Sequence, residues 1–321
     1  MDSSSDEVAF YRPNFVRIYK DGRVERLAGT EIVPPTAVDP QTGISSKDVL
    51  IEPETGVSAR LFLPKIITNS SPQKLPLLVY YHGGGFCIET PFSPVYNRYV
   101  SSLVAEANVV AVSVHYRRAP EDPLPIAYDD SWKVLQWVIS HSKGNGPEAW
   151  LNEHADLSRV TMIGDSAGAN IAHNMALRAA ETPLEEGVRL VGLCLVHPYF
   201  HGENQQLASE ATNEEKKGKA DKLWMLLCPS STGCDDPLMN PATCVNLEKL
   251  VSKRVLVCVA EKDFLKERGL FYHKTLGKSG WGGELELMEV EGEDHVFHLF
   301  NPTSEKAVAM MSCLASFLNR D

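Results

Sequence analysis

From Leu75 onwards, short apolar runs alternate with segments of helical spacing, and this alternation is the strongest constraint on the fold. The runs LPLLVYY and VVAVSVH are apolar throughout, as strands buried on both faces of a sheet are. The segments RYVSSLVAEAN and AYDDSWKVLQWVISHS that follow them carry apolar residues at helical spacing. The alternation continues to a closing helix expected over 304–318. It predicts an α/β fold with a mostly parallel central sheet flanked by helices.

Two features stand apart from this alternation. The front of the chain carries two hairpin signals, over 15–27 and 47–65, whereas residues 1–12 show no pattern and are expected to lack regular structure. Residues 201–240 interrupt the sequence between two strands, and a connection of that length is usually functional. We expect one domain over residues 1–321, in which 1–30 and about 201–240 contribute a cap over an active site.

Composition narrows the class of protein. The chain has 321 residues, of which 43% are hydrophobic and 23% charged, as in ordinary globular proteins. Its formal net charge of −11 argues against nucleic acids and anionic membranes as partners, since both require basic patches. No apolar run is long enough to span a bilayer, and the acidic start MDSSSDEVAF is unlike a secretory signal. The seven scattered cysteines read as free thiols, so the expected location is cytoplasmic.

The motif Gly164-Asp165-Ser166-Ala167-Gly168 lies where an apolar run becomes a helical pattern. A serine on a sharp strand-to-helix turn exposes its Oγ, and its glycine neighbours allow the strand and helix to approach closely. The helix that follows offers free N–H groups and the positive end of its dipole. The alternative is a turn that merely requires glycine. The flanking strand and helix favour Ser166 as a nucleophile.

The segment His82-Gly83-Gly84-Gly85-Phe86 follows a buried strand. Acyl transfer places negative charge on a carbonyl oxygen, and preorganised backbone N–H groups stabilise that charge. A tight turn explains one glycine but not three in succession. The N–H groups of Gly83, Gly84 and Ala167 are therefore the predicted oxyanion hole.

An acid and a histidine follow two later strands. Asp263 ends the apolar run VLVCVAEKD, and His295 follows the acidic turn 291–294. Glu261 and Asp235 compete for the role of the acid, and His298 competes for that of the base. Position at a strand end favours Asp263, whereas apolar surroundings indicate a packing role for His298. The order serine, acid, histidine is typical of chains with a G-x-S-x-G elbow.

Motifs for other chemistry are missing from the sequence. It contains no H-E-x-x-H motif, no clustered Cys/His ligand set and no Walker loop, so no metal and no nucleotide cofactor is expected. The remaining histidines are assigned packing roles: His82, His115, His141, His154, His173, His197, His201 and His273.

Six motifs are informative when they are taken together: YYHGGGF, VSVHYRRAPE, YDDSWKVLQWV, GDSAGANIAHN, EKDFLKERG and DHVFHLF. Their joint occurrence resembles the hormone-sensitive-lipase-type α/β-hydrolases, and more narrowly the plant carboxylesterases. The opening YKDGRVERL is similar to that of the 2-hydroxyisoflavanone dehydratases within this group. The resemblance extends from about Phe15 to Leu318.

The resemblance implies a serine carboxylesterase that uses no cofactor. Ser166 would be the nucleophile, His295 the general base and acid, and Asp263 its orienting partner. Gly83, Gly84 and Ala167 would form the oxyanion hole. The expected reaction is hydrolysis of short-to-medium acyl esters of small molecules through an acyl-enzyme.

Two alternative functions come from members of the same family that have lost hydrolysis. One is a lyase, in which the histidine acts as the base of an elimination, as in 2-hydroxyisoflavanone dehydratase. The other is a non-catalytic small-molecule receptor. The dehydratases often carry threonine at the position of Ser166, and the receptors lack a histidine at that of His295. This chain retains both residues, which favours hydrolysis.

Overall fold

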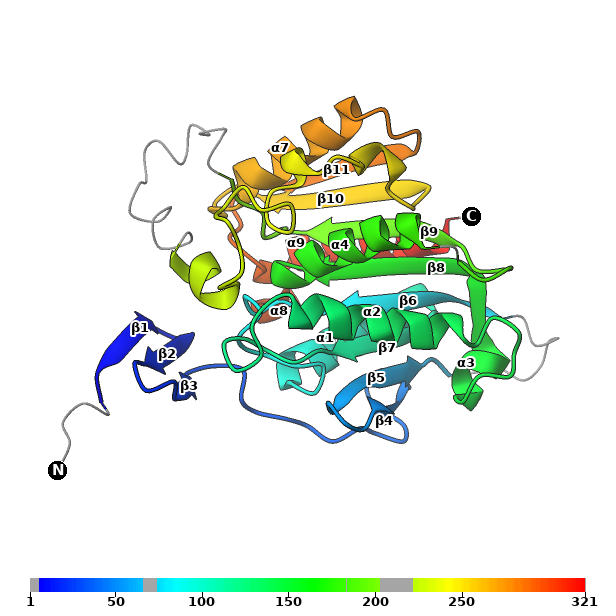
Figure 1. Cartoon of the computed structure of the whole chain (residues 1–321). Helices are drawn as coiled ribbons and strands as arrows, with labels where there is room; N and C mark the ends of the chain where they lie inside the picture. The colour runs from blue at the N-terminus through cyan, green and yellow to red at the C-terminus, as the bar shows by residue number, and fades with distance from the viewer. Residues whose placement is uncertain (1–5, 66–73, 183, 203–221, 321) are drawn as a thin grey trace.

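The computed structural model describes residues 6–65, 74–182, 184–202 and 222–320. Its main sheet has eight strands, and Figure 1 shows them stacked through the centre of the molecule. In sheet order they are β11 (Glu284–Val290), β10 (Arg254–Ala260), β9 (Leu190–Val196), β8 (Ala155–Asp165), β6 (Leu75–Tyr81), β7 (Val110–His115), β5 (Val57–Leu63) and β4 (Ser45–Glu52). Only the β7–β5 and β5–β4 pairs are antiparallel, so the predicted mostly parallel sheet is confirmed.

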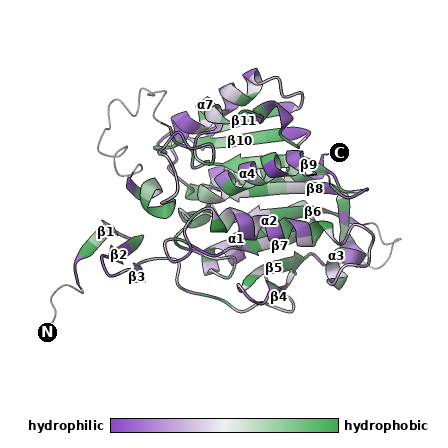
Figure 2. Ribbon diagram, viewed as in Figure 1, coloured by the Kyte–Doolittle hydropathy of each residue, from purple (hydrophilic) through white to green (hydrophobic). Residues whose placement is uncertain are grey.

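The central strands are buried because their residues are apolar on both faces. Every residue of β9 and β10 is buried, and Figure 2 shows the middle of the sheet as predominantly hydrophobic. The edge strand β11 instead alternates apolar and acidic residues, and only its last residue is buried. An edge strand of this kind has one face against the protein and one toward water.

Helices cover both faces of the sheet (Figure 1). On one face lie α2 (Ile126–Ile139), α4 (Ala167–Glu181) and α7 (Lys266–Lys278), and on the other α1 (Pro94–Ala107) and α9 (Glu305–Asn319). Shorter helices include α3 (Ala149–His154), α8 (Phe297–Phe300), η1 (Pro241–Thr243) and η2 (Leu247–Lys249). Each face has its own apolar core. The closing helix predicted over 304–318 is confirmed as α9.

A second, small antiparallel sheet lies at the start of the chain. It contains β1 (Val8–Arg12), β2 (Val16–Tyr19) and β3 (Val24–Arg26). The predicted hairpin is confirmed as β2–β3, but the prediction that residues 1–12 lack regular structure is wrong for 8–12. Isolated from β2, the largely exposed β1 has no pattern that marks a strand, because its stability comes from pairing with its neighbour.

Arg26 and Phe15 attach the small sheet to the main body. Arg26 Nε donates a 2.7 Å hydrogen bond to the carbonyl oxygen of Cys87, and its guanidinium forms a 2.6 Å ion pair with Glu121. The ring of Phe15, in the β1–β2 turn, is almost completely buried. The sheet is therefore docked by both polar and apolar contacts, close to the glycine segment that precedes Cys87.

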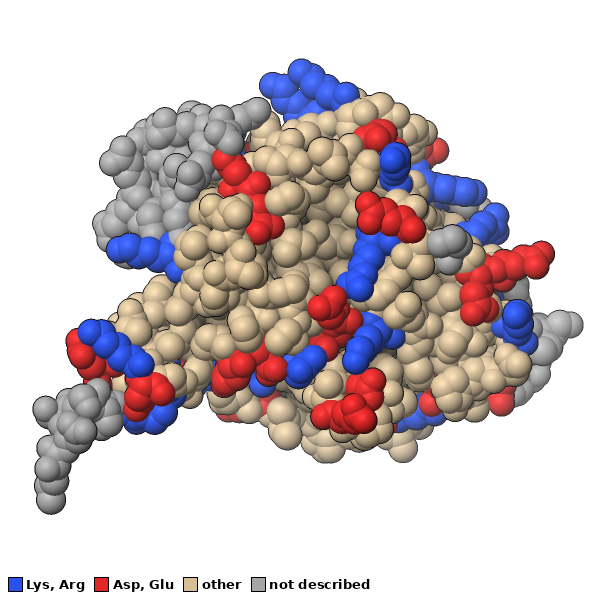
Figure 3. Space-filling view, viewed as in Figure 1, with Lys and Arg blue, Asp and Glu red and all other residues tan. Residues whose placement is uncertain are grey.

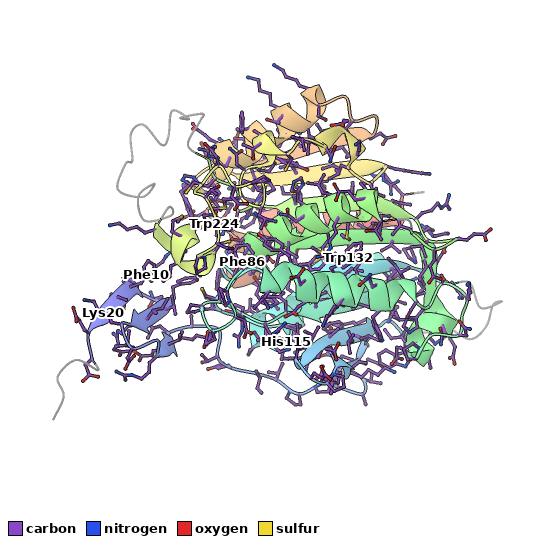
Figure 4. The ribbon with its side chains drawn as sticks, viewed as in Figure 1. Phe10, Lys20, Phe86, His115, Trp132 and Trp224 are labelled. Carbon is purple, nitrogen blue, oxygen red and sulfur yellow. The ribbon has the colours of Figure 1, made fainter. Side chains whose placement is uncertain are left out.

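The predicted cap segment 201–240 falls partly outside the described residues, which omit 203–221. Residues 222–227 are helical, and Figure 1 shows this helix and the small sheet at the same end of the main sheet, where β8 finishes. Trp224 is fully buried, and its ring lies 6.5 Å from that of Phe86; Figure 4 labels both residues at this end of the sheet. Both parts of the predicted cap thus contain segments at the carboxyl edge of the sheet.

The surface shows no concentration of one charge on the face seen in Figure 3, where acidic and basic side chains are interspersed. Within the described ranges, no helix has the length and apolar character needed to cross a membrane. All seven cysteines are free thiols, as predicted, and five of them are buried.

Candidate active site

Ser166 lies on the sharp turn between β8 and α4. Its backbone has φ 53° and ψ −118°, which is a strained conformation for a residue with a side chain. A Cβ on Gly164 would collide with the carbonyl of Gly168, and one on Gly168 with that of Tyr81. The two glycines are therefore needed for the close approach of helix and strand, as the sequence predicted.

The three residues predicted from separate strand ends lie in one hydrogen-bonded chain. Ser166 Oγ donates to His295 Nε2 at 3.0 Å, and His295 Nδ1 donates to Asp263 Oδ2 at 2.8 Å. Asp263 is buried, and its Oδ1 accepts the backbone N–H of Leu265 at 2.9 Å. The carboxylate is thus fixed while the imidazole faces both neighbours. This geometry suits the transfer of a proton from Ser166 to His295.

The alternative acids, Glu261 and Asp235, and the alternative base, His298, lie outside this hydrogen-bonded chain. Glu261 accepts a hydrogen bond from the backbone N–H of Gly292 at 2.6 Å, and Asp235 accepts one from Asn240 at 2.9 Å. His298 is fully buried, and neither ring nitrogen has a hydrogen-bond partner among the described residues. Burial lowers the pKa of His298 to about 3, so the ring stays neutral. Its surroundings agree with the predicted packing role.

The structure of the glycine segment shows that one of the predicted oxyanion-hole donors is wrong. The N–H of Gly83 donates to the hydroxyl of Tyr96 at 2.9 Å, so it is not available to a ligand. Gly84 and Gly85 line the cavity beside Ser166, at φ 95° and 56°, and their N–H groups have no partner among the described residues. The N–H of Ala167, the first residue of α4, is likewise unpaired there. The available donors are therefore Gly84, Gly85 and Ala167.

Asp165 connects the elbow to this glycine segment. Its buried carboxylate accepts hydrogen bonds from Tyr80 Oη at 2.8 Å and from Tyr96 Oη at 2.7 Å. Burial raises the pKa of Asp165 to about 6, and the two tyrosine donors only partly offset that effect. Tyr96 was not predicted as a site residue, because a tyrosine on an apolar helix face is ordinarily a core residue.

A cavity of about 280 Å³ opens above Ser166. Its floor contains Ser166, His295 and the glycine segment, and the small sheet contributes Arg12 to Phe15 as one wall. Other walls come from Leu223 of the insert and from Phe264 and Phe300, which are 42% and 73% exposed and form an apolar rim. A cavity of this size accommodates a small organic molecule.

Among the described residues, one group of side chains has ligand atoms close enough together to be considered for a metal ion. Atoms of His197, Asp263 and His295 lie within 4.8 Å of one another. However, His295 Nδ1 and Asp263 Oδ2 already share a hydrogen bond, and His197 Nδ1 accepts the N–H of Val296 at 2.9 Å. These bonds suit orientation of His295 better than metal ligation. The role predicted for His197 was packing, although its place directly after β9 puts it at the same sheet edge as the predicted site.

The chain is similar to known proteins along its whole length. A family model described as the alpha/beta hydrolase fold matches residues 78–299. The chain is 44% identical to "Probable carboxylesterase 2" of Arabidopsis thaliana, over 100% of this chain and 99% of the relative. It is 42% identical to "2-hydroxyisoflavanone dehydratase" of Glycyrrhiza echinata, over 98% of each chain.

A similar solved structure has the same architecture. The esterase LipW from Mycobacterium marinum matches with a TM-score of 0.70 and 25% identity, over 87% of this chain and 82% of that one. The family match covers the elbow, the acid and the histidine. The chain therefore belongs to the α/β-hydrolase fold family.

Proposed function

We propose that this protein is a serine carboxylesterase in which Ser166, His295 and Asp263 form the catalytic triad. The observation that carries the proposal is the hydrogen-bonded chain of these three side chains at the floor of a cavity. Each residue comes from a different strand end, yet their reacting atoms lie within hydrogen-bond distance. The carboxylesterase name of a relative that matches the whole chain supports the same reaction class.

The reaction proceeds in two acyl-transfer steps. Ser166 Oγ attacks the ester carbonyl while His295 Nε2 takes the hydroxyl proton, and Asp263 stabilises the resulting imidazolium. The C–O bond of the ester breaks, His295 gives the proton to the departing alcohol, and the acyl group remains on Ser166. Water then attacks the acyl-enzyme with His295 again as base, which releases the carboxylic acid and restores Ser166.

The negative charge on the carbonyl oxygen is stabilised by the N–H groups of Gly84, Gly85 and Ala167. These replace the set predicted from sequence, since the N–H of Gly83 is used by Tyr96. Donors held in place by the backbone require no reorganisation during the reaction. Loss of one such donor typically costs about 2.7–4 kcal/mol in transition-state stabilisation.

The cavity supports short-to-medium acyl esters as substrates. Its volume of about 280 Å³ lies near the lower end of the range typical for small-molecule sites. Its walls include residues 12–15 and Leu223, which supports a cap formed from both parts of the chain over one α/β-hydrolase domain.

The seven free thiols fit a reducing compartment, so the proposed location of the enzyme is the cytoplasm. Imaging of a fluorescent fusion tests this location.

The experiment that tests the proposed function compares wild type with Ser166→Ala on p-nitrophenyl esters of increasing acyl length. Wild type should prefer short and medium chains, and S166A should lose at least about 10³-fold in kcat. Ser312→Ala, an exposed serine of α9, is the matched control and should retain full activity. Hydrolysis by S166A at the wild-type rate would overturn the proposal.

A second candidate function is elimination of water, favoured by the 42% identity to a 2-hydroxyisoflavanone dehydratase. In that reaction His295 would act as the base, and the glycine N–H groups would stabilise an enolate. Product analysis on a 2-hydroxyisoflavanone distinguishes the two, because dehydration releases no carboxylic acid. Turnover of that compound, with no hydrolysis of simple esters, would favour the lyase.

A further inference from the structure

The turn formed by residues 196–199 holds the backbone of the nucleophile. Val196 ends β9, and its carbonyl oxygen accepts the N–H of Ser166 at 2.9 Å. Tyr199 donates its own N–H to the carbonyl oxygen of Ser166 at 3.0 Å. Both backbone polar groups of Ser166 are therefore bonded to this one turn. Its position fixes the position of the nucleophile.

The same turn contacts the segment that carries the histidine. His197 is 1% exposed, and its Nδ1 accepts the backbone N–H of Val296 at 2.9 Å. Val296 follows His295 directly and has φ 46°, a left-handed conformation that is rare for a β-branched residue. Strain of this kind persists only where surrounding contacts hold the backbone. The bond to His197 is such a contact.

The ring of His197 also packs against the whole 295–298 segment. Its centroid lies 5.8 Å from that of His295, 5.9 Å from Phe297 and 5.6 Å from His298. The backbone N–H of His197 donates to the carbonyl oxygen of Cys258 at 2.8 Å, which anchors the residue on β10. His197 thus joins the nucleophile turn, strand β10 and the histidine segment.

The hydrogen bond to Val296 determines the protonation state of His197. Because Nδ1 accepts an N–H, it carries no proton, and the ring is the neutral form with its proton on Nε2. Burial is the main reason that the pKa of His197 lies well below its usual value, and the neighbouring His298 and His295 lower it further. Because the His197 ring is neutral, it does not compete with His295 for the negative charge of Asp263.

We infer that His197 is a positioning residue, which holds the His295 segment at a fixed distance from Ser166 by accepting the N–H of Val296. This inference rests on the proposed hydrolase function. The 3.0 Å contact between Ser166 Oγ and His295 Nε2 joins the nucleophile turn to the histidine segment. The side chain of His197 is bonded to the histidine segment at Val296, and its backbone belongs to the 196–199 turn that binds Ser166. Without that bond, the backbone at Val296 relaxes and His295 moves out of line.

Two substitutions of similar size separate the role of the acceptor from simple packing. In His197→Asn the amide oxygen can occupy the place of Nδ1 and still accept the N–H of Val296. In His197→Leu no acceptor remains. We expect H197L to lower kcat by about 10–100-fold with KM changed less than threefold, because displacement of a catalytic group by about 1 Å has an effect of this order. H197N should remain within about threefold of wild type.

A spectroscopic measurement reports the position of His295 directly. The downfield proton resonance of its Nδ1–H depends on the hydrogen bond to Asp263, so it should be retained in H197N and shifted or lost in H197L. If H197L does not fold, His197→Gln serves instead, because its longer side chain places the acceptor away from Val296. H197Q should then show the same loss of kcat.

The inference is overturned if folded H197L, or H197Q in its place, keeps wild-type kcat and an unchanged resonance, or if H197N is as impaired as either. That failure is distinct from failure of the proposed function. In the first case wild type still hydrolyses esters and depends on Ser166, whereas in the second S166A is as active as wild type.

Discussion

The hydroxyl of Tyr96 donates a 2.7 Å hydrogen bond to Oδ2 of Asp165. The same hydroxyl accepts the backbone N–H of Gly83 at 2.9 Å. Asp165 immediately precedes Ser166, and Gly83 immediately precedes the N–H groups assigned to the oxyanion hole. One side chain on α1 therefore ties the nucleophile turn to the glycine segment.

Removal of the Tyr96 hydroxyl should lower the rate of hydrolysis. In Tyr96→Phe the buried N–H of Gly83 loses its acceptor, which costs about 1–3 kcal/mol and favours a shift of the glycine segment. We expect kcat to fall by about tenfold or more with little change in KM, because the affected donors bind the transition state rather than the substrate. Steady-state kinetics on p-nitrophenyl butyrate measure both parameters.

Tyr80→Phe is the matched control for that experiment. Tyr80 donates to the other oxygen of Asp165 at 2.8 Å and, among the described residues, its hydroxyl makes no hydrogen bond to the glycine segment. Both variants remove one donor from Asp165, so both should lose stability, but Y80F should keep a higher kcat. Equal kinetic effects would show that the Asp165 contact alone matters, and that the bond to Gly83 does not.

Asp263 should be the only one of the three candidate acids that supports catalysis. In Asp263→Asn the amide no longer holds the proton of His295 on Nδ1, and the expected loss in kcat is about 10³–10⁴-fold. Glu261→Gln changes an acid two residues away whose side chain accepts the backbone N–H of Gly292, and this variant should remain near wild type. Comparable losses in E261Q and D263N would contradict the assignment of Asp263.

The sequence predicted the three proposed catalytic side chains because their positions depend on a general property of parallel sheets. Ser166, Asp263 and His295 each follow a strand, and the carboxyl ends of parallel strands meet at one edge. Their identities and chain order then match a known chemical pattern. Such a prediction is not weakened by the separation in sequence, which is 97 residues from Ser166 to Asp263 and 32 residues from Asp263 to His295.

The residues that support them were less predictable, since their roles depend on dihedral angles and on tertiary neighbours. Which of three consecutive glycines keeps an unpaired N–H beside the cavity depends on the local backbone, which has φ values of 95° and 56° at Gly84 and Gly85. The bond from Gly83 to Tyr96 requires α1 to be placed. Helix α7 was missed because two glycines interrupt its sequence KERGLFYHKTLGK and lower its helix propensity.

Phe15 should limit the size of the ester that the enzyme accepts. A Cβ on Gly85 would lie 2.8 Å from Phe15 Cζ, so this ring closes the cavity directly over the glycine segment. Phe15→Ala removes that wall, and the ratio of kcat/KM for bulky to small esters should rise by about tenfold. The ratio is measured on two series, one varied in the acyl group and one in the alcohol.

Tyr11→Ala is the control for the Phe15 variant. Tyr11 lies on β1 of the same small sheet, is 52% exposed and does not line the cavity. Y11A should keep the wild-type ratio in both series. If F15A also keeps it while hydrolysing small esters normally, the small sheet does not limit substrate size.

Asp165 should make folding stability fall as pH rises through the weakly acidic range. Burial raises its pKa to about 6 in the folded protein, whereas an unfolded aspartate has a value of about 3.9. Below about pH 4 both states are protonated and the contribution of Asp165 to stability is complete. Between about pH 4 and 6 the unfolded state loses its proton first, so the free energy of unfolding decreases, by about 3 kcal/mol in all.

The comparison that isolates this effect is wild type against Asp165→Asn, which carries no charge at any pH. Other titrating groups are common to both proteins, so the difference in their unfolding free energies reports Asp165 alone. Urea unfolding at intervals from pH 4 to 7.5 should show wild type losing stability relative to D165N as the pH rises. A constant difference over that range would mean that Asp165 keeps an ordinary pKa, and that the hydrogen bonds from Tyr80 and Tyr96 fully offset its burial.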